Sequence, residues 1–128
     1  MDYHISRTVS GSFDDVVGRV AEALKSEGFG VLTEIDVRKT LKAKLGVDFR
    51  HYTILGACNP ALAHRALLAE DKVGVLLPCN VVVQDRDDGK VEISAMDPAA
   101  AMSVIDNAEV GAVARTVREK LARVVAGV

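Results

Sequence analysis

Helix-capping residues recur along this sequence and divide it into short, alternating segments. Ser12 precedes an apolar stripe of helical spacing that begins at Phe13, and Gly28 can adopt the left-handed conformation that ends a helix. Asp36 can cap a second helix, and Asn59-Pro60 sets a capping side chain before a proline at the first helical position. We therefore expect one helix from Phe13 to just before Gly28, and two more over residues 37–45 and 61–69.

Between these helices lie segments with the period of two that is typical of half-buried strands. In the first of them Tyr3, Ile5 and Val9 share one side, although Arg7 stands on that side and interrupts the apolar face. Asp87-Asp88-Gly89 supplies a turn between two late extended segments, which predicts a β-hairpin. The expected strands cover residues 3–10, 29–35, 49–57, 73–77, 81–83 and 90–96.

A long amphipathic helix closes the chain. Asp97-Pro98 opens a short Ala-rich turn, and the final helix begins near Asp106 or Asn107, with an apolar stripe from Val110 to Val125. No linker or repeat interrupts residues 1–128, so we expect a single domain. Because the late connections are of the hairpin type, the order of elements predicts an α+β fold. Its sheet is largely antiparallel and carries helices on one face.

Composition narrows the classes of function. Hydrophobic residues make up 49% of the 128 residues, and the formal net charge is −2, which argues against a dedicated nucleic-acid binder. The apolar runs are too short to span a membrane, and residues 1–5 lack the basic start and apolar core of a signal peptide. We expect a cytoplasmic protein that binds neither nucleic acid nor membranes.

Two cysteines carry the most distinctive local pattern. Cys58-Asn59-Pro60 follows one expected strand, and Pro78-Cys79-Asn80 interrupts extended structure later in the chain. Two strand ends of one sheet can lie close together, so we expect Cys58, Asn59, Cys79 and Asn80 to share a pocket. Without an export signal, the two thiols are expected to be reduced.

Three chemical uses of the thiols are open. The helix that begins after Cys58 favours a thiolate there, and two thiols within reach can cycle between dithiol and disulfide. Two thiolates and a histidine can hold a soft metal such as zinc, but the spacing matches no standard zinc motif, so we expect no cofactor. The opposing interpretation is that both cysteines pack in the core as small hydrophobic residues.

The remaining candidates are a histidine and a basic helix. His51 opens the strand that ends at Cys58, so its side chain can line the same cleft, whereas His64 is expected to face solvent. The helix over 37–45 carries four basic residues, of which Arg38, Lys39 and Lys42 form a possible anion-binding site. The alternative for this helix is a solvated face around a narrow apolar stripe.

Several segments resemble a known family. The stretch Leu55-Gly56-Ala57-Cys58-Asn59-Pro60, the stretch from Gly74 to Val83 with its Pro78-Cys79-Asn80, the segment from Asp36 to Gly46, and Met96-Asp97-Pro98 are similar to domain-of-unknown-function family 302. This resemblance to small bacterial and archaeal proteins covers essentially the whole chain. It implies a TATA-binding-protein-like fold with a curved antiparallel sheet and a final helix, and it implies a homodimer. It implies no established activity.

Two functions are therefore weighed. The first is a homodimeric domain that binds a small molecule or a sulfur-carrying protein in a pocket near Cys58 and Cys79. The second is a structural or protein-interaction module whose cysteines are buried and chemically inert. No dinucleotide-binding, nucleophile-elbow or zinc-protease motif is present, so the sequence leaves open whether the protein is an enzyme.

Overall fold

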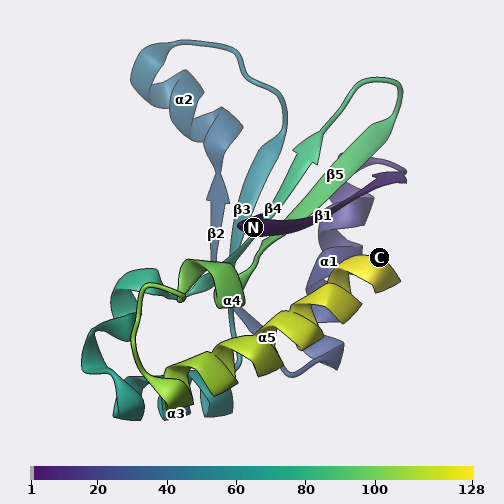
Figure 1. The fold of residues 1–128 in the computed structure, drawn as a ribbon. Helices are drawn as coiled ribbons and strands as arrows, with labels where there is room; N and C mark the ends of the chain where they lie inside the picture. Colours follow the sequence, from purple (N-terminus) through teal and green to yellow (C-terminus); the bar gives the residue numbers. More distant parts are fainter. Residues whose placement is uncertain (1) are drawn as a thin grey trace.

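A five-stranded antiparallel sheet with the strand order β1-β5-β4-β3-β2 organises the chain. The computed structural model describes residues 2–128 (Figure 1). The elements are β1 (His4–Ser10), α1 (Phe13–Ser26), β2 (Gly30–Asp36), α2 (Val37–Leu45), β3 (Tyr52–Cys58), α3 (Pro60–Ala69), the 3₁₀ helix η1 (Asp71–Leu76), β4 (Cys79–Asp85), β5 (Lys90–Met96), α4 (Pro98–Ala101) and α5 (Ala108–Gly127). The α+β class, the antiparallel sheet and the long C-terminal helix are confirmed.

The expected capping residues begin their helices. The Ser12 hydroxyl accepts a hydrogen bond from the Asp15 N–H at 3.3 Å, and the Asp36 carboxylate accepts one from the Lys39 N–H at 2.9 Å. Asn59, Asp97 and Asn107 cap α3, α4 and α5 in the same way. Each cap satisfies backbone N–H groups that a helix leaves without an internal partner.

The hydrophobic core lies between one face of the sheet and the helices. Along β4 and β5 every second side chain points to the core, so that Val81, Val83, Val91, Ile93 and Ala95 are buried there while the residues between them point to the other side. The apolar stripes of α1 and α5 pack against this face. Full burial of one valine or leucine side chain contributes about 1.5–3 kcal/mol, so the sheet and these two helices form the stable body of the molecule.

The interruption of the β1 pattern by Arg7 has a structural reason. The Arg7 guanidinium donates hydrogen bonds to the carbonyl oxygens of Val125, Ala126 and Val128, the last at 2.8 Å. These carbonyls lie at the C-terminal end of α5, where a helix has acceptors without partners and a partial negative charge. Arg7 therefore caps α5 from the neighbouring strand.

The expected strand over residues 73–77 is wrong. Residues Asp71–Leu76 form η1, in which Val73 is buried but Val75 is 86% exposed. The Glu70 side chain accepts a hydrogen bond from the Lys72 N–H and caps this turn. The place beside β3 in the sheet is taken by β4, which begins only at Cys79, after a cis Leu77-Pro78 peptide bond.

The segment formed by β2 and α2 buries little of its surface against the rest of the molecule. All seven residues of β2 are exposed, and none of the nine residues of α2 is buried. Figure 1 shows α2 extending beyond the sheet from the end of β2. Within residues 2–128, no helix is long and apolar enough to cross a membrane.

Candidate functional site

The two cysteines come together where β3 ends and β4 begins. These strands are antiparallel neighbours, and Cys79 lies opposite Ala57, the residue directly before Cys58. The missing side chain of Gly56 leaves room for Pro78 and Thr33 to pack against β3. A Cβ at this position would stand 2.9 Å from Pro78 Cγ and closer still to Thr33 Oγ1. The expected proximity of the thiols therefore follows from the register of two neighbouring strands.

Both thiols line one small apolar cavity. The residues around it come from the strand ends, from α3 and from the N-terminal half of α5, and they include Phe29, Ala63, Ala66, Cys58, Asn59, Pro78, Cys79, Met102, Val113 and Val117. Its volume is about 30 Å³, which is room for one or two water-sized groups. Cavities that bind larger organic ligands measure about 300–1,000 Å³. The occupant of this cavity is therefore limited to a few atoms.

The two thiols differ in environment. Cys58 is half-buried, whereas Cys79 is 6% exposed. Burial, together with the nearby Cys58, raises the pKa of the Cys79 thiol to about 11. Because the charged thiolate is disfavoured away from water, Cys79 is a neutral thiol at physiological pH.

Asn59 lines the cavity, but its polar atoms are already used. Its Oδ1 accepts a hydrogen bond from the Leu62 N–H at 3.3 Å, and its Nδ2 donates one to the Glu27 carbonyl at 3.5 Å. The side chain thus caps α3 and ties it to the end of α1. A structural role accounts for both ends of this carboxamide.

Asn80 lies on the opposite side of β4 from Cys79, outside the cysteine cavity. It is exposed on the sheet face away from α1 and α5, where it lines a groove of about 460 Å³. The floor of this groove includes a hydrogen-bonded row in which the Ser6 hydroxyl contacts His4 Nδ1 at 2.7 Å and Ser94 Oγ at 2.8 Å. Sequence reasoning did not single out Ser6 or Ser94, although both occupy the polar positions of alternating strands.

His51 is also placed away from the cysteines. Its ring stacks on Phe13, with ring centroids 5.1 Å apart, and its Nε2 lies 2.7 Å from Arg38 Nη1. A guanidinium can only donate, so Nε2 is the acceptor in this contact. His51 therefore joins the basic residues Arg38, Lys39 and Lys42 around a groove of about 470 Å³.

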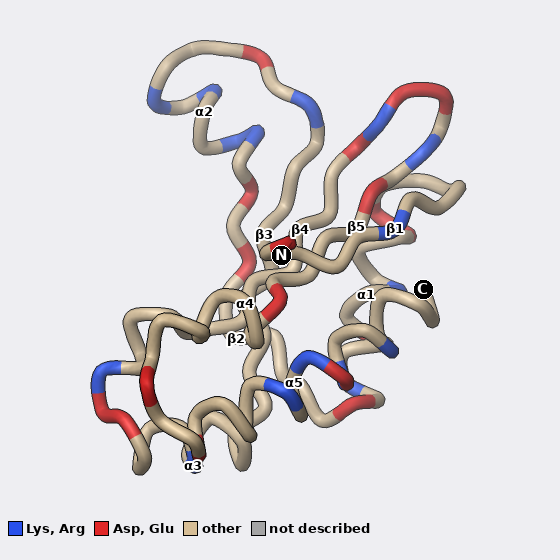
Figure 2. Tube along the Cα trace, in the orientation of Figure 1, with Lys and Arg blue, Asp and Glu red and all other residues tan. Residues whose placement is uncertain are grey.

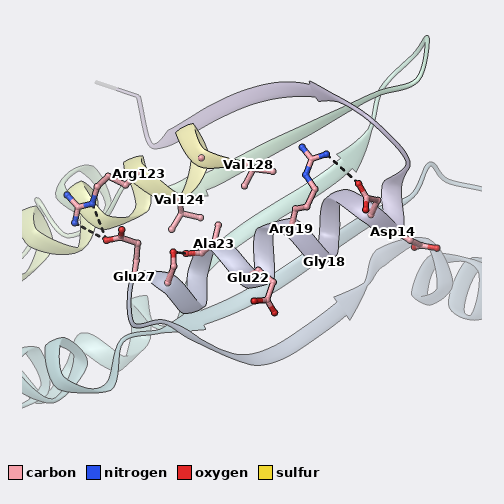
Figure 3. Close-up of a pocket in the computed structure, with 12 residues that line it drawn as sticks. Asp14, Gly18, Arg19, Glu22, Ala23, Glu27, Arg123, Val124 and Val128 are labelled. Atoms are coloured by element: carbon pink, nitrogen blue, oxygen red, sulfur yellow. Dashed lines mark hydrogen bonds and ion pairs between the residues drawn. The ribbon is translucent and has the colours of Figure 1, made fainter.

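A larger hollow has no thiol. It measures about 780 Å³ and lies between α1 and the end of α5 (Figure 3). Two ion pairs line it: Arg123 with Glu27 at 2.9 Å, and Arg19 with Asp15 at 3.4 Å. It is an open surface depression, and we place the candidate chemistry at the cavity that both thiols of the chain line.

Metal-binding side chains are not gathered at either thiol. Throughout residues 2–128, no three His, Cys, Asp or Glu side chains lie close enough together to hold a metal ion.

Comparison with known proteins identifies relatives without an assigned activity. The crystal structure of an uncharacterized conserved DUF302 protein from Bacillus stearothermophilus is 32% identical, with a TM-score of 0.89. The alignment covers 97% of this chain and 96% of that one. No curated protein matches the chain. The model of the domain of unknown function DUF302 matches residues 5–128, and the chain belongs to this family.

Proposed function

We propose that this protein is a small homodimeric domain that handles sulfur at Cys58, with Cys79 as the buried neighbour of the reacting atom. The observation that carries the proposal is the apolar cavity of about 30 Å³ lined by both thiols. A space of this size accommodates a single added sulfur atom but no larger metabolite. The substrate class is therefore a low-molecular-weight persulfide or a sulfur-carrying protein.

The reaction transfers one sulfur atom without an external oxidant. The Cys58 thiolate attacks the outer sulfur of the donor persulfide, a new S–S bond forms, and the S–S bond of the donor breaks. The donor leaves as a thiolate, and Cys58 carries the transferred sulfur as a persulfide. The apolar wall of the cavity keeps water and competing thiols from this product.

Cys79 acts as a neutral thiol in this scheme. With a pKa of about 11, only about one molecule in ten thousand carries a Cys79 thiolate at pH 7. Cys79 is thus a poor nucleophile, and its S–H is available as a weak hydrogen-bond donor to the sulfur on Cys58. This argues against rapid cycling between a dithiol and a Cys58–Cys79 disulfide.

A second function is favoured by different observations. The burial of Cys79 and the small size of the cavity also fit a module whose cysteines only pack, and the exposed β2 and α2 fit an interaction surface. In that case neither thiol reacts until the protein unfolds.

Native mass spectrometry after treatment with inorganic polysulfide separates the two functions. We expect the wild-type protein to gain the mass of one sulfur atom, which a reductant removes. Cys58→Ser should gain nothing, and Cys79→Ser should gain the sulfur but lose it faster to added thiol. Absence of sulfur uptake, with both thiols resistant to iodoacetamide in the folded protein, would contradict sulfur handling and support the interaction module.

A further inference from the structure

The groove between α2 and the start of β3 gathers positive charge. The helix α2 carries four basic and no acidic residues, as Figure 2 shows. Three of them, Arg38, Lys39 and Lys42, line the groove of about 470 Å³ together with His51 and Asp36. The Asp36 carboxylate already accepts a hydrogen bond from the Lys39 N–H as the cap of α2. The volume lies in the range of about 300–1,000 Å³ that is typical of small-molecule sites.

The positions of these charges are unfavourable for the helix itself. The N-terminal end of a helix carries a partial positive charge, which favours acidic residues in the first turn. The helices α1 and α5 follow this rule, whereas α2 begins with Arg38 and Lys39 and has no acidic residue in its first turn. Arg38 and Lys42 also stand four residues apart, a spacing at which like charges repel. Local arrangements that cost stability are expected where residues serve a function.

The basic groups of the groove have little counter-charge of their own. Arg38 and Lys39 have no ion-pair partner within residues 2–128. The Arg38 guanidinium instead donates a hydrogen bond to His51 Nε2 at 2.7 Å. Lys42 pairs with Asp48 at 3.1 Å, but both side chains are well exposed, so this pair is weak and easily exchanged. An anion from outside the chain can therefore supply the missing charge.

We propose that this groove binds the phosphate group of a small phosphorylated metabolite. Apart from His51, its lining carries three positive charges and one negative charge, a net charge of +2. A phosphate monoester carries about −1.5 to −2 charges at pH 7 and offers three acceptor oxygens, which matches this lining. The Arg38 fork can donate to two of these oxygens, and the two lysines add point charges. The site is separate from the cysteine cavity and goes beyond the sulfur chemistry proposed there.

His51 acts as a positioning residue for Arg38. Its ring stacks on Phe13, with ring centroids 5.1 Å apart, and its Nε2 accepts from the guanidinium. A guanidinium has five N–H donors, so Arg38 keeps this bond and still offers donors to a phosphate. Holding a long exposed side chain in place before binding lowers the entropy that binding costs.

A nitrogen-15 NMR titration with glycerol 3-phosphate tests the site. We expect saturable shifts of the backbone amides over residues 36–43 and of His51, and none with glycerol alone. Arg38→Ala should weaken binding about tenfold, because charge-assisted hydrogen bonds are lost. The matched control is Lys44→Ala, which removes a charge from the same helix but outside the groove lining. This control should bind like the wild type.

A double variant tests the role of His51. His51→Phe keeps an aromatic ring beside Phe13 but removes the acceptor for Arg38, so binding should weaken about threefold. In the Arg38→Ala background the same change should have no further effect, because His51 acts through Arg38. Additive losses would overturn the positioning role.

The remaining outcomes decide the site itself. Equal losses in Arg38→Ala and Lys44→Ala would show a general attraction to a solvated basic helix and overturn the groove. The absence of saturable shifts up to about 10 mM glycerol 3-phosphate would overturn the phosphate site. Equal affinity for succinate, which carries two carboxylates, would overturn the preference for phosphate. Sulfur uptake at Cys58 should be unchanged in all these variants, so failure of this site and failure of the proposed function are observed separately.

Discussion

At the scale of single residues, Cys79 links burial to the pH dependence of stability. Its pKa is about 11 in the folded protein, against an ordinary value of 9.0 in an exposed chain. Between these values the unfolded chain has lost the thiol proton while the folded protein still holds it. Stability is therefore fully present below pH 9 and falls as the pH rises from 9 to 11.

We expect this one thiol to cost about 1.4 kcal/mol of stability by pH 10. The measurement is urea unfolding at pH 8 and pH 10 for the wild type and for Cys79→Ala. The variant should be less stable at pH 8 but should lose less stability between the two pH values. Equal losses in the two proteins would show that Cys79 ionises normally in the folded state.

The position of Gly56 has no room for a side chain. Gly56→Ala should destabilise the protein by about 2 kcal/mol, because the added methyl group meets Thr33 and Pro78 at the entrance of β4. The matched control is Gly30→Ala, where a Cβ has open space. Thermal unfolding of both variants should show a lower Tm for Gly56→Ala alone.

The candidate residues show what a sequence can and cannot predict at this scale. Strand order and strand ends bring Cys58 and Cys79 together, and both ends were visible as a cysteine followed by an asparagine, with a proline within two residues. Adjacent residues in a strand point to opposite faces, however, so Asn80 turns away from the cavity that Cys79 lines. His51 is separated from the thiols by the length of β3 and meets Arg38 instead, a contact that depends on where α2 lies.

At the scale of elements, the contact between β1 and α5 depends on one arginine. Arg7→Ala should destabilise the protein by about 1–2 kcal/mol, because three carbonyls at the end of α5 lose their donor. Arg7→Lys keeps a charge near the helix end and should lose less. Chemical denaturation measures both, and Arg115→Ala on the exposed side of α5 should be near the wild type.

The elements themselves were largely predictable, and the single error has a physical reason. Caps and periodicity located the helices, because these signals are local. The segment from Val73 to Leu77 is apolar enough for a strand, and a short apolar run has no period that distinguishes a strand from a helical turn. Most of it forms the 3₁₀ helix η1, because β4, which begins at Cys79, occupies the position beside β3.

At the scale of the whole molecule, stability should be distributed unevenly. Amide hydrogen exchange should be slowest in β4 and β5, which are central and packed on the core, and fastest in β2 and α2, which bury almost nothing within the chain. Equal protection of β2 and β4 would contradict this uneven distribution.

The α+β architecture could be predicted from the sequence, because hairpin signals and a final amphipathic helix are compatible with few arrangements of strands and helices. The exposure of β2 was not, since its apolar residues read as those of an ordinary half-buried strand. Only the folded arrangement shows that β2 is an edge strand and that all seven of its residues are exposed. The TATA-binding-protein-like description stays a prediction.

The open β2 edge also has a consequence for solubility. The exposed side chains Val31, Leu32 and Ile35 lie on a sheet edge that has neither lysine nor proline, and such edges favour edge-to-edge association. Leu32→Lys places a charge on this edge and should stay in solution longer than the wild type on prolonged storage, whereas Lys39→Glu leaves the edge apolar and should precipitate like the wild type.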